Sequence, residues 1–164
     1  MEVMETIKRF LNGRGGTVIF YVLILLMVLF GSHKIIGSSM FPTYHEGQRV
    51  ATVRAFVPLR RGDVVVAYNK NSKLLIKRIA GVPGDHVLIS NEGKVLVNGE
   101  EYHYGVGNPS IGPSFSNMTY TENGYEIDLQ EKEYFLLGDN FEHSADSRSY
   151  GIFKRWQIWE KVLT

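Results

Sequence analysis

The sequence contains no cysteine among its 164 residues. This absence excludes disulfides, thiol catalysis and thiolate metal sites. An excess of either charge is also missing, since 18 Lys and Arg face 17 Asp and Glu. The chain therefore has no basic field of the kind that binds nucleic acid, and it shows no motif typical of a metal or nucleotide cofactor. With 44% hydrophobic and 21% charged residues, it is expected to be globular, with one small domain.

One long apolar run lies near the N-terminus. Residues 17–30 read TVIFYVLILLMVLF, and uncharged residues extend from Gly15 to Ser32, 18 in all. A helix of that length would measure about 27 Å, close to the ~30 Å hydrocarbon core of a bilayer. The run is apolar on every face, which a small domain could hardly cover, and no small-residue cleavage site of a secretory signal follows it. We therefore expect residues 15–34 to form an uncleaved transmembrane anchor in contact with lipid.

Basic residues flank this run unequally, with three in residues 1–14 and only Lys34 directly after it. Cytoplasmic flanks of membrane helices carry an excess of Lys and Arg. The sequence therefore predicts a single-pass protein of the cell membrane, with residues 1–14 as a cytoplasmic tail and residues 35–164 as an extracytoplasmic domain.

From Ile35 onward the sequence has short β-branched runs separated by turns. Runs such as DVVVAY (63–68) and KLLIKRIAGV (73–82) are typical of strands, and KVLV between NEG and NG has the pattern of a compact hairpin. Residues 103–124 are rich in Gly, Pro, Ser and Asn, which predicts a long irregular insertion. We expect a mainly β fold for residues 35–164.

Two residue types in this domain could support nucleophilic catalysis. The turn GSSMFPTY (37–44) closely follows the apolar run and carries adjacent Ser38 and Ser39, although Ser, Pro and Thr also form ordinary turns. A serine becomes a useful nucleophile only when a neighbouring base takes its proton. The five histidines lie in polar or turn contexts, and among them His143 is the best candidate for this base.

Lys77 is an unusual lysine because it lies within LLIKRI, which has the pattern of a buried strand. Burial against Ile76 and Ile79 would lower the pKa of its amine, from about 10.4 toward the roughly 7–8 that suits a general base. Alternatively, its stem packs while its charged end reaches water. The polar loop at 138–151 offers further hydroxyls and charges, or is a hydrated turn.

Four motifs follow the apolar run in a fixed order: SMFPT at 39–43, RGDVVV at 61–66, KRIAGVPGD at 77–85 and GDNFEHSADSR at 138–148. Together they resemble the type I signal peptidases of bacteria, which are membrane-anchored Ser-Lys leader peptidases. The resemblance covers nearly the whole chain from residue 17. It implies a β-rich catalytic domain after a single transmembrane helix, and a cofactor-free serine endopeptidase that removes signal peptides from exported preproteins.

The resemblance also implies roles for individual residues. Ser39 would be the nucleophile and Lys77 the general base, while Ser144 would hydrogen-bond and orient the lysine. Gly37 stands where some relatives carry a serine of the oxyanion hole, so the Ser39 backbone N–H, helped by Ser38, would hold the oxyanion. The residues that match the supporting polar cluster are Asp139, Asp146 and Arg148.

Substrate pockets are expected around these two groups, lined by apolar side chains that suit small substrate residues. The residues concerned are Ile35, Ile36, Met40, Tyr44, Leu75 and Ile76. If the anchor ends near Ile35, Ser39 lies within about 14 Å of the membrane, because only four residues separate them. Two alternatives remain open: another membrane-anchored Ser-Lys protease that cleaves itself, and a non-catalytic anchored β module that binds exported proteins.

Overall fold

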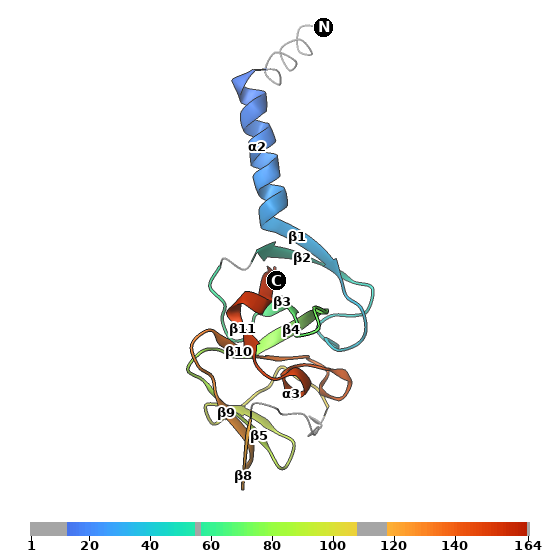
Figure 1. Ribbon diagram of the computed structural model, residues 1–164. Helices are drawn as coiled ribbons and strands as arrows, with labels where there is room; N and C mark the ends of the chain where they lie inside the picture. Colours follow the sequence, from blue (N-terminus) through green and yellow to red (C-terminus); the bar gives the residue numbers. More distant parts are fainter. Residues whose placement is uncertain (1–12, 55–56, 108–117, 164) are drawn as a thin grey trace.

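The computed structural model describes residues 13–54, 57–107 and 118–163 (Figure 1). Within these residues the chain forms a long helix, a seven-stranded sheet and a five-stranded sheet. The prediction of a mainly β domain is therefore confirmed. Most of the expected tail at 1–14, and residues 108–117 of the expected insertion, lie outside the described residues.

Helix α2 (Arg14–Leu29) follows the apolar run and projects away from both sheets (Figure 1). Its 16 residues give a length of about 24 Å. None of the helices in the described part of the chain meets the combined length and hydropathy expected of a membrane span.

The expected anchor at 15–34 is wrong at its C-terminal end. Phe30–Lys34 forms strand β1, whose backbone pairs with strand β2, so these residues leave the helix. Ser39 consequently lies ten residues beyond the helix end at Leu29, rather than four beyond an anchor ending near Ile35.

The seven-stranded sheet has the order β1-β2-β12-β3-β4-β10-β11 within the described residues. Its other strands are β2 (Arg49–Arg54), β3 (Val64–Tyr68), β4 (Leu74–Gly81), β10 (Glu133–Leu137), β11 (Phe153–Lys154) and β12 (Ile158–Val162). The two runs DVVVAY and KLLIKRIAGV thus supply β3 and β4, and the pair is antiparallel. Short helices lie between the last strands: η1 (Phe141–His143), α3 (Ser147–Tyr150) and η2 (Arg155–Gln157).

The five-stranded sheet has the order β7-β6-β5-β9-β8, again within the described residues, and lies at the end of the molecule away from α2 (Figure 1). Its strands are β5 (His86–Ser90), β6 (Val95–Val97), β7 (Glu100–Glu101), β8 (Thr119–Thr121) and β9 (Gly124–Asp128). The predicted hairpin is β5-β6. The expected irregular insertion at 103–124 is wrong at its end, because the β-branched and aromatic residues of β8 pair with β9.

Among the described residues, three clusters of buried apolar side chains make up the core. One joins the two sheets through residues such as Val87, Ile89 and Phe135, and a second packs against β3, β4 and β10. The third lies under the turn after β1, and its buried residues are Ile35, Met40, Tyr44, Val50, Val64, Val66 and Val162. Because burying a large apolar side chain stabilises by about 1.5–3 kcal/mol, this third cluster fastens the turn to the sheet.

Candidate active site

Ser39 lies on the turn between β1 and β2, at the entrance to the third apolar cluster. The adjacent Met40 is only 1% exposed, and Tyr44 at the end of the turn is also buried. Gly37 has a φ of 79°, in the left-handed region that favours glycine. The sequence of this turn thus fixes both ends of the segment that carries Ser39.

Lys77 approaches Ser39 from the middle of β4, where it is paired with Val65 of β3. Its Nζ donates hydrogen bonds to Ser39 Oγ at 2.7 Å and to the Ile76 carbonyl oxygen at 2.9 Å. Lys77 is only 3% exposed. The structure therefore brings together the two residues that the sequence selected as nucleophile and base, and it excludes the alternative in which the charged end of Lys77 reaches water.

Burial lowers the pKa of Lys77 to about 8, because removing an ammonium group from water disfavours its charged form. The negative charges of Asp146 and Asp139 act in the opposite direction, with smaller effect. The positive charges of Arg148 and Lys73 reinforce the fall. An amine with this pKa is neutral in a large fraction of molecules near pH 8, as a general base requires.

The loop after β10 holds the Ser39 turn from the other side. The backbone N–H of Asn140 donates to the Ser39 carbonyl oxygen at 3.0 Å, and its side-chain Nδ2 donates to the Ser38 carbonyl oxygen at 3.2 Å. Asn140 fixes the backbone on which the nucleophile sits. Asn140 was not among the residues predicted from the sequence, although it stands in the same GDN motif as Asp139.

Asp139 accepts hydrogen bonds from two residues of other elements and is completely buried. Arg78 donates to it from Nε at 2.9 Å and from Nη2 at 2.6 Å, and the Thr43 hydroxyl donates at 2.5 Å. This network links β4 to the Ser39 turn. Arg78 was not predicted from the sequence either, although its place directly after Lys77 on a strand with a buried pattern was a usable signal.

Asp146 and Arg148 form a second buried pair, distinct from the first. Arg148 Nε and Nη2 each donate to Asp146 at 2.9 Å, and Asp146 also caps the N-terminus of α3. Asp146 Oδ2, which accepts from Arg148 Nη2, also accepts from the Gly138 backbone N–H at 3.0 Å. The three residues of the predicted polar cluster therefore belong to two separate ion pairs, Asp139 with Arg78 of β4 and Asp146 with Arg148 within the loop after β10.

Ser144 does not make the expected hydrogen bond to Lys77. Its Oγ is buried and has no hydrogen-bond partner in the described part of the chain, because the Lys77 amine is directed at Ser39 and at the Ile76 carbonyl oxygen. The hydroxyl lies beside Gly138, where a Cβ atom would overlap both Ser144 Oγ and the Ser39 carbonyl oxygen. Glycine at 138 thus lets three segments of the site approach one another.

A cleft of about 370 Å³ opens beside the two residues and includes Gly37 and Ser38 in its lining. Five of the six predicted substrate-binding residues line it as well: Ile35, Ile36, Met40, Leu75 and Ile76. The sixth, Tyr44, is not among the lining residues, because its ring packs into the apolar cluster under the turn.

His143 lines the cleft, but within the described residues its side chain makes no hydrogen bond to Ser39, whose Oγ is bonded to Lys77. Among the same residues, no group of His, Asp or Glu side chains is arranged to hold a metal ion.

Comparison with known proteins places this arrangement in a family. Residues 7–163 match the family described as Signal peptidase, peptidase S26. The chain belongs to the signal peptidase family. This membership confirms the predicted resemblance and, with it, the prediction of a serine endopeptidase.

Individual members of the family resemble the chain over most of its length. Signal peptidase I S of Bacillus subtilis (strain 168) is 33% identical over 159 residues, which cover 92% of this chain and 85% of that protein. Signal peptidase I of Bacillus amyloliquefaciens is 32% identical, and the match covers 79% of this chain and 72% of that protein. The crystal structure of a signal peptidase I from Enterococcus faecalis V583 aligns with a TM-score of 0.50 at 26% identity and covers 67% of this chain and 100% of that one.

Proposed function

We propose that the chain removes N-terminal signal peptides from exported preproteins, with Ser39 as nucleophile and Lys77 as general base. The observation that carries this proposal is the 2.7 Å hydrogen bond between Lys77 Nζ and Ser39 Oγ, made by a lysine that is 3% exposed. The names of the relatives, signal peptidases, support the choice of substrate. Membership of a peptidase family disfavours the non-catalytic binding module.

The chemistry begins with neutral Lys77, which takes the proton of the Ser39 hydroxyl as Oγ attacks the scissile carbonyl carbon. The negative charge that develops on the carbonyl oxygen needs donors that are already in place. In the described part of the chain, the Ser39 backbone N–H donates to no protein acceptor, so it is available to this oxyanion, with the Ser38 hydroxyl beside it. Lys77 then gives its proton to the leaving amine, and in its neutral form it activates the water that hydrolyses the acyl-enzyme.

The surrounding polar residues act by positioning this pair. Asp139 links the loop after β10 to Thr43 of the Ser39 turn and to Arg78 of β4, and the Asp146–Arg148 pair braces the loop itself. The Ser144 hydroxyl, buried and without a partner among the described residues, accepts a hydrogen bond from the Lys77 amine when Ser39 turns toward the substrate. This contact belongs to a reacting state, since Lys77 is bonded to Ser39 in the structure.

The apolar cleft supplies the specificity. Its 370 Å³ is at the small end of ligand sites, which suits small substrate side chains. Ile36 is exposed, at 83%, whereas Ile35 and Met40 are buried. The exposed and half-buried side chains at 36, 75 and 76 contact the substrate, and the buried ones support them.

We also propose that α2 anchors the chain in the cell membrane, with residues 1–14 in the cytoplasm and the domain from Ile35 outside. Side chains on every side of α2 are exposed, among them Phe20 at 60%, Tyr21 at 64% and Met27 at 78%. Lipid would cover this apolar surface, which the domain leaves open. A helix of about 24 Å is shorter than the ~30 Å hydrocarbon core, and local bilayer thinning accommodates such a difference.

The test of the peptidase proposal is processing of a preprotein by the purified chain reconstituted in vesicles. We expect Ser39→Ala and Lys77→Ala to abolish processing while circular dichroism shows an intact fold. The comparison variant is Ser38→Ala, which removes the hydroxyl beside the oxyanion; it should retain part of the activity, because the Ser39 backbone N–H still donates to the oxyanion. Loss of processing in Ser38→Ala, together with activity in Ser39→Ala, would show that the nucleophile has been misassigned. If the purified chain cleaves itself but no preprotein, the self-cleaving alternative is correct.

A further inference from the structure

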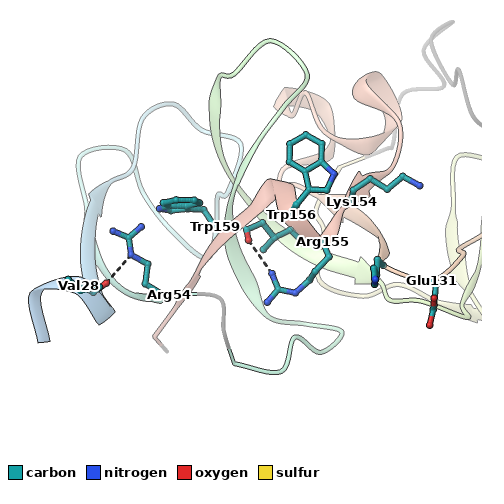
Figure 2. Close-up of a pocket in the computed structure, with 9 residues that line it drawn as sticks. Val28, Arg54, Glu131, Lys154, Arg155, Trp156 and Trp159 are labelled. Atoms are coloured by element: carbon teal, nitrogen blue, oxygen red, sulfur yellow. Dashed lines mark hydrogen bonds between the residues drawn. The ribbon is translucent and has the colours of Figure 1, made fainter. Parts of the chain in front are cut away.

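Residues 102–107 reach the active site from the five-stranded sheet. They follow β7 and include the first residues of the predicted insertion, to which the proposed reaction assigns no role. The groove at the base of α2, where Arg54 Nε donates to the Val28 carbonyl oxygen at 3.0 Å, lies elsewhere (Figure 2). The described residues that line that groove include none that lines the cleft at Ser39.

Backbone hydrogen bonds place Asn140 between Val106 and Ser39. The Val106 N–H donates to the Asp139 carbonyl oxygen at 2.9 Å, and the Phe141 N–H donates to the Val106 carbonyl oxygen at 2.9 Å. At the opposite edge of the same short segment, the Asn140 N–H donates to the Ser39 carbonyl oxygen at 3.0 Å. Because the hydrogen-bonding groups of successive residues alternate between the two edges of an extended segment, Val106 holds the edge opposite the nucleophile.

Packing against the core fixes residues 102–107 in this position. Tyr102 is buried in the cluster that joins the two sheets, and its ring centre lies 6.3 Å from that of Phe141. A Cβ atom at Gly105 would overlap the Phe141 ring, so glycine is required for the backbone to lie this close. The segment is therefore pressed against the loop after β10 on both sides of Tyr104.

Tyr104 adds a side-chain contact to the backbone contact of Val106. Its ring centre lies 4.8 Å from Cζ of Arg78, and an aromatic face attracts a guanidinium at this distance. Arg78 in turn donates to Asp139 and, from Nη1, to the Gly62 carbonyl oxygen at 2.8 Å. The Tyr104 ring therefore covers the ion pair that links β4 to the loop holding Ser39.

We propose that residues 102–107 are a positioning segment, which holds the nucleophile in place through the Val106 backbone and the Tyr104 ring. The inference rests on the proposed function and deepens it, because it assigns two further positioning residues to the same reaction. Among the described residues that line the cleft, neither Tyr104 nor Val106 appears. Loosening the segment should therefore lower kcat, which depends on the placement of Ser39, and leave KM nearly unchanged.

Val106→Pro tests the backbone contact, because proline has no N–H to donate to the Asp139 carbonyl oxygen. A displacement of about 1 Å at a reacting group can cost about a hundredfold in rate, so we expect kcat for a short peptide in detergent to fall about tenfold to a hundredfold. Hydrogen exchange followed by NMR should show faster exchange of the Asn140 N–H and unchanged exchange within β3 and β4. Val106→Ala is the comparison variant, since it keeps both backbone hydrogen bonds and should retain most of the activity.

Tyr104→Leu tests the side-chain contact and does not depend on whether proline is tolerated at 106. It should lower kcat by about twofold to fivefold, the factor that corresponds to an exposed cation–π contact. Tyr104→Phe keeps a ring over Arg78 and should restore kcat. The matched control is Tyr120→Leu, because Tyr120 is an exposed tyrosine of β8 whose ring packs on Tyr125; it should leave kcat unchanged.

Three results would overturn the proposal. These are unchanged Asn140 exchange in folded Val106→Pro, normal kcat in Tyr104→Leu, or losses in both variants that appear in KM rather than kcat. The last would show that the segment shapes the cleft instead of positioning Ser39. If Val106→Pro does not fold, the comparison of Tyr104→Leu with Tyr104→Phe decides.

The exchange measurement needs no substrate, so it separates this inference from the proposed function. Unchanged exchange of the Asn140 N–H in Val106→Pro would reject the positioning segment while the unsubstituted chain still cleaves the peptide. Failure of the unsubstituted chain to cleave any signal-peptide substrate would instead reject the proposed function, whatever the exchange rates are.

Discussion

Arg78 and Asp139 form a buried ion pair in which Nε and Nη2 of the guanidinium donate to the two carboxylate oxygens, at 2.9 and 2.6 Å. Arg78 directly follows Lys77 on β4, and Asp139 directly precedes Asn140, whose N–H bonds to the Ser39 carbonyl oxygen. The pair therefore joins the strand that carries the base to the loop that holds the nucleophile. Neither residue contacts Ser39 Oγ, so both act by positioning.

Removing one partner of this pair should destabilise the chain strongly. Arg78→Met leaves the carboxylate of Asp139 buried without a counter-charge, and such a change costs about 3–5 kcal/mol of unfolding free energy. The matched control is Arg61→Met, which breaks the Arg61–Asp85 pair. The Arg61 side chain is 38% exposed, so solvent screening limits that loss to about 1 kcal/mol. Urea unfolding measures both, and equal losses would contradict the importance of the Arg78–Asp139 pair.

The pH dependence of kcat/KM should report the titration of Lys77. Burial lowers its pKa to about 8, and only the neutral amine accepts the serine proton. Activity should therefore fall as pH decreases through about 8, by about tenfold per pH unit below it. Lys77→Arg keeps a charge that cannot be removed and should be as inactive as Lys77→Ala. Near-normal turnover by Lys77→Arg would exclude lysine as the base and make His143 the next residue to test.

Lys73 should tune this titration without taking part in the chemistry. It lines the cleft, and its positive charge lowers the pKa of Lys77. Lys73→Met should raise that pKa and move the acid limb of the profile to higher pH. Lys70→Met on the same β3–β4 turn is the control, because Lys70 is not among the groups that shift Lys77. Identical profiles for both variants would mean that the Lys73 charge does not reach the site.

The sequence predicted the parts of this site that lie in local patterns. The strands β3 and β4 follow β-branched runs, and the ordered motifs identified Ser39 and Lys77 although 38 residues separate them. Strand β1 was not predictable in this way, since Phe30 continues an apolar run and leaves the helix only because β2 supplies a pairing partner. Asn140 acts on Ser39 through its own backbone N–H, which no side-chain pattern records. Tyr44 lies near Ser39 in sequence, yet its ring turns into the core, and only tertiary packing decides such a direction.

Ser144→Ala should lower activity without lowering stability. Its buried hydroxyl has no partner among the described residues, so its removal breaks no bond and is neutral or slightly stabilising in urea unfolding. In the proposed reaction the hydroxyl orients the Lys77 amine, and loss of a hydrogen bond to a group that becomes charged costs about tenfold to a hundredfold in rate. Unchanged kcat would show that Ser144 has no part in positioning Lys77. A clear loss of stability would show that it has a structural partner instead.

Burial of the charged Lys77 amine should also lower the free energy of unfolding at neutral pH, compared with a pH at which the amine is neutral. The pKa of Lys77 is about 8 in the folded chain against an ordinary value of 10.5, so between these values the unfolded state binds more protons and stability rises with pH. Below pH 8 the full cost of burying the charged amine applies, about 3 kcal/mol at 1.36 kcal/mol per pKa unit.

Lys77→Met removes that charge from a side chain of similar length. It also loses the hydrogen bonds to Ser39 and the Ile76 carbonyl oxygen, each worth about 1 kcal/mol. We therefore expect Lys77→Met to be inactive but about 1 kcal/mol more stable than the unsubstituted chain at pH 7. Above pH 10.5, where Lys77 is neutral in both the folded and the unfolded chain, the unsubstituted chain should be the more stable of the two. Thermal unfolding in one detergent at the two pH values, with the exposed Lys70→Met as control, would detect the crossing. If Lys77→Met is less stable at both pH values, the Lys77 amine remains well hydrated in the folded chain. Burial would then not explain a lowered pKa of Lys77, and the proposal that Lys77 is the base would lose its physical support.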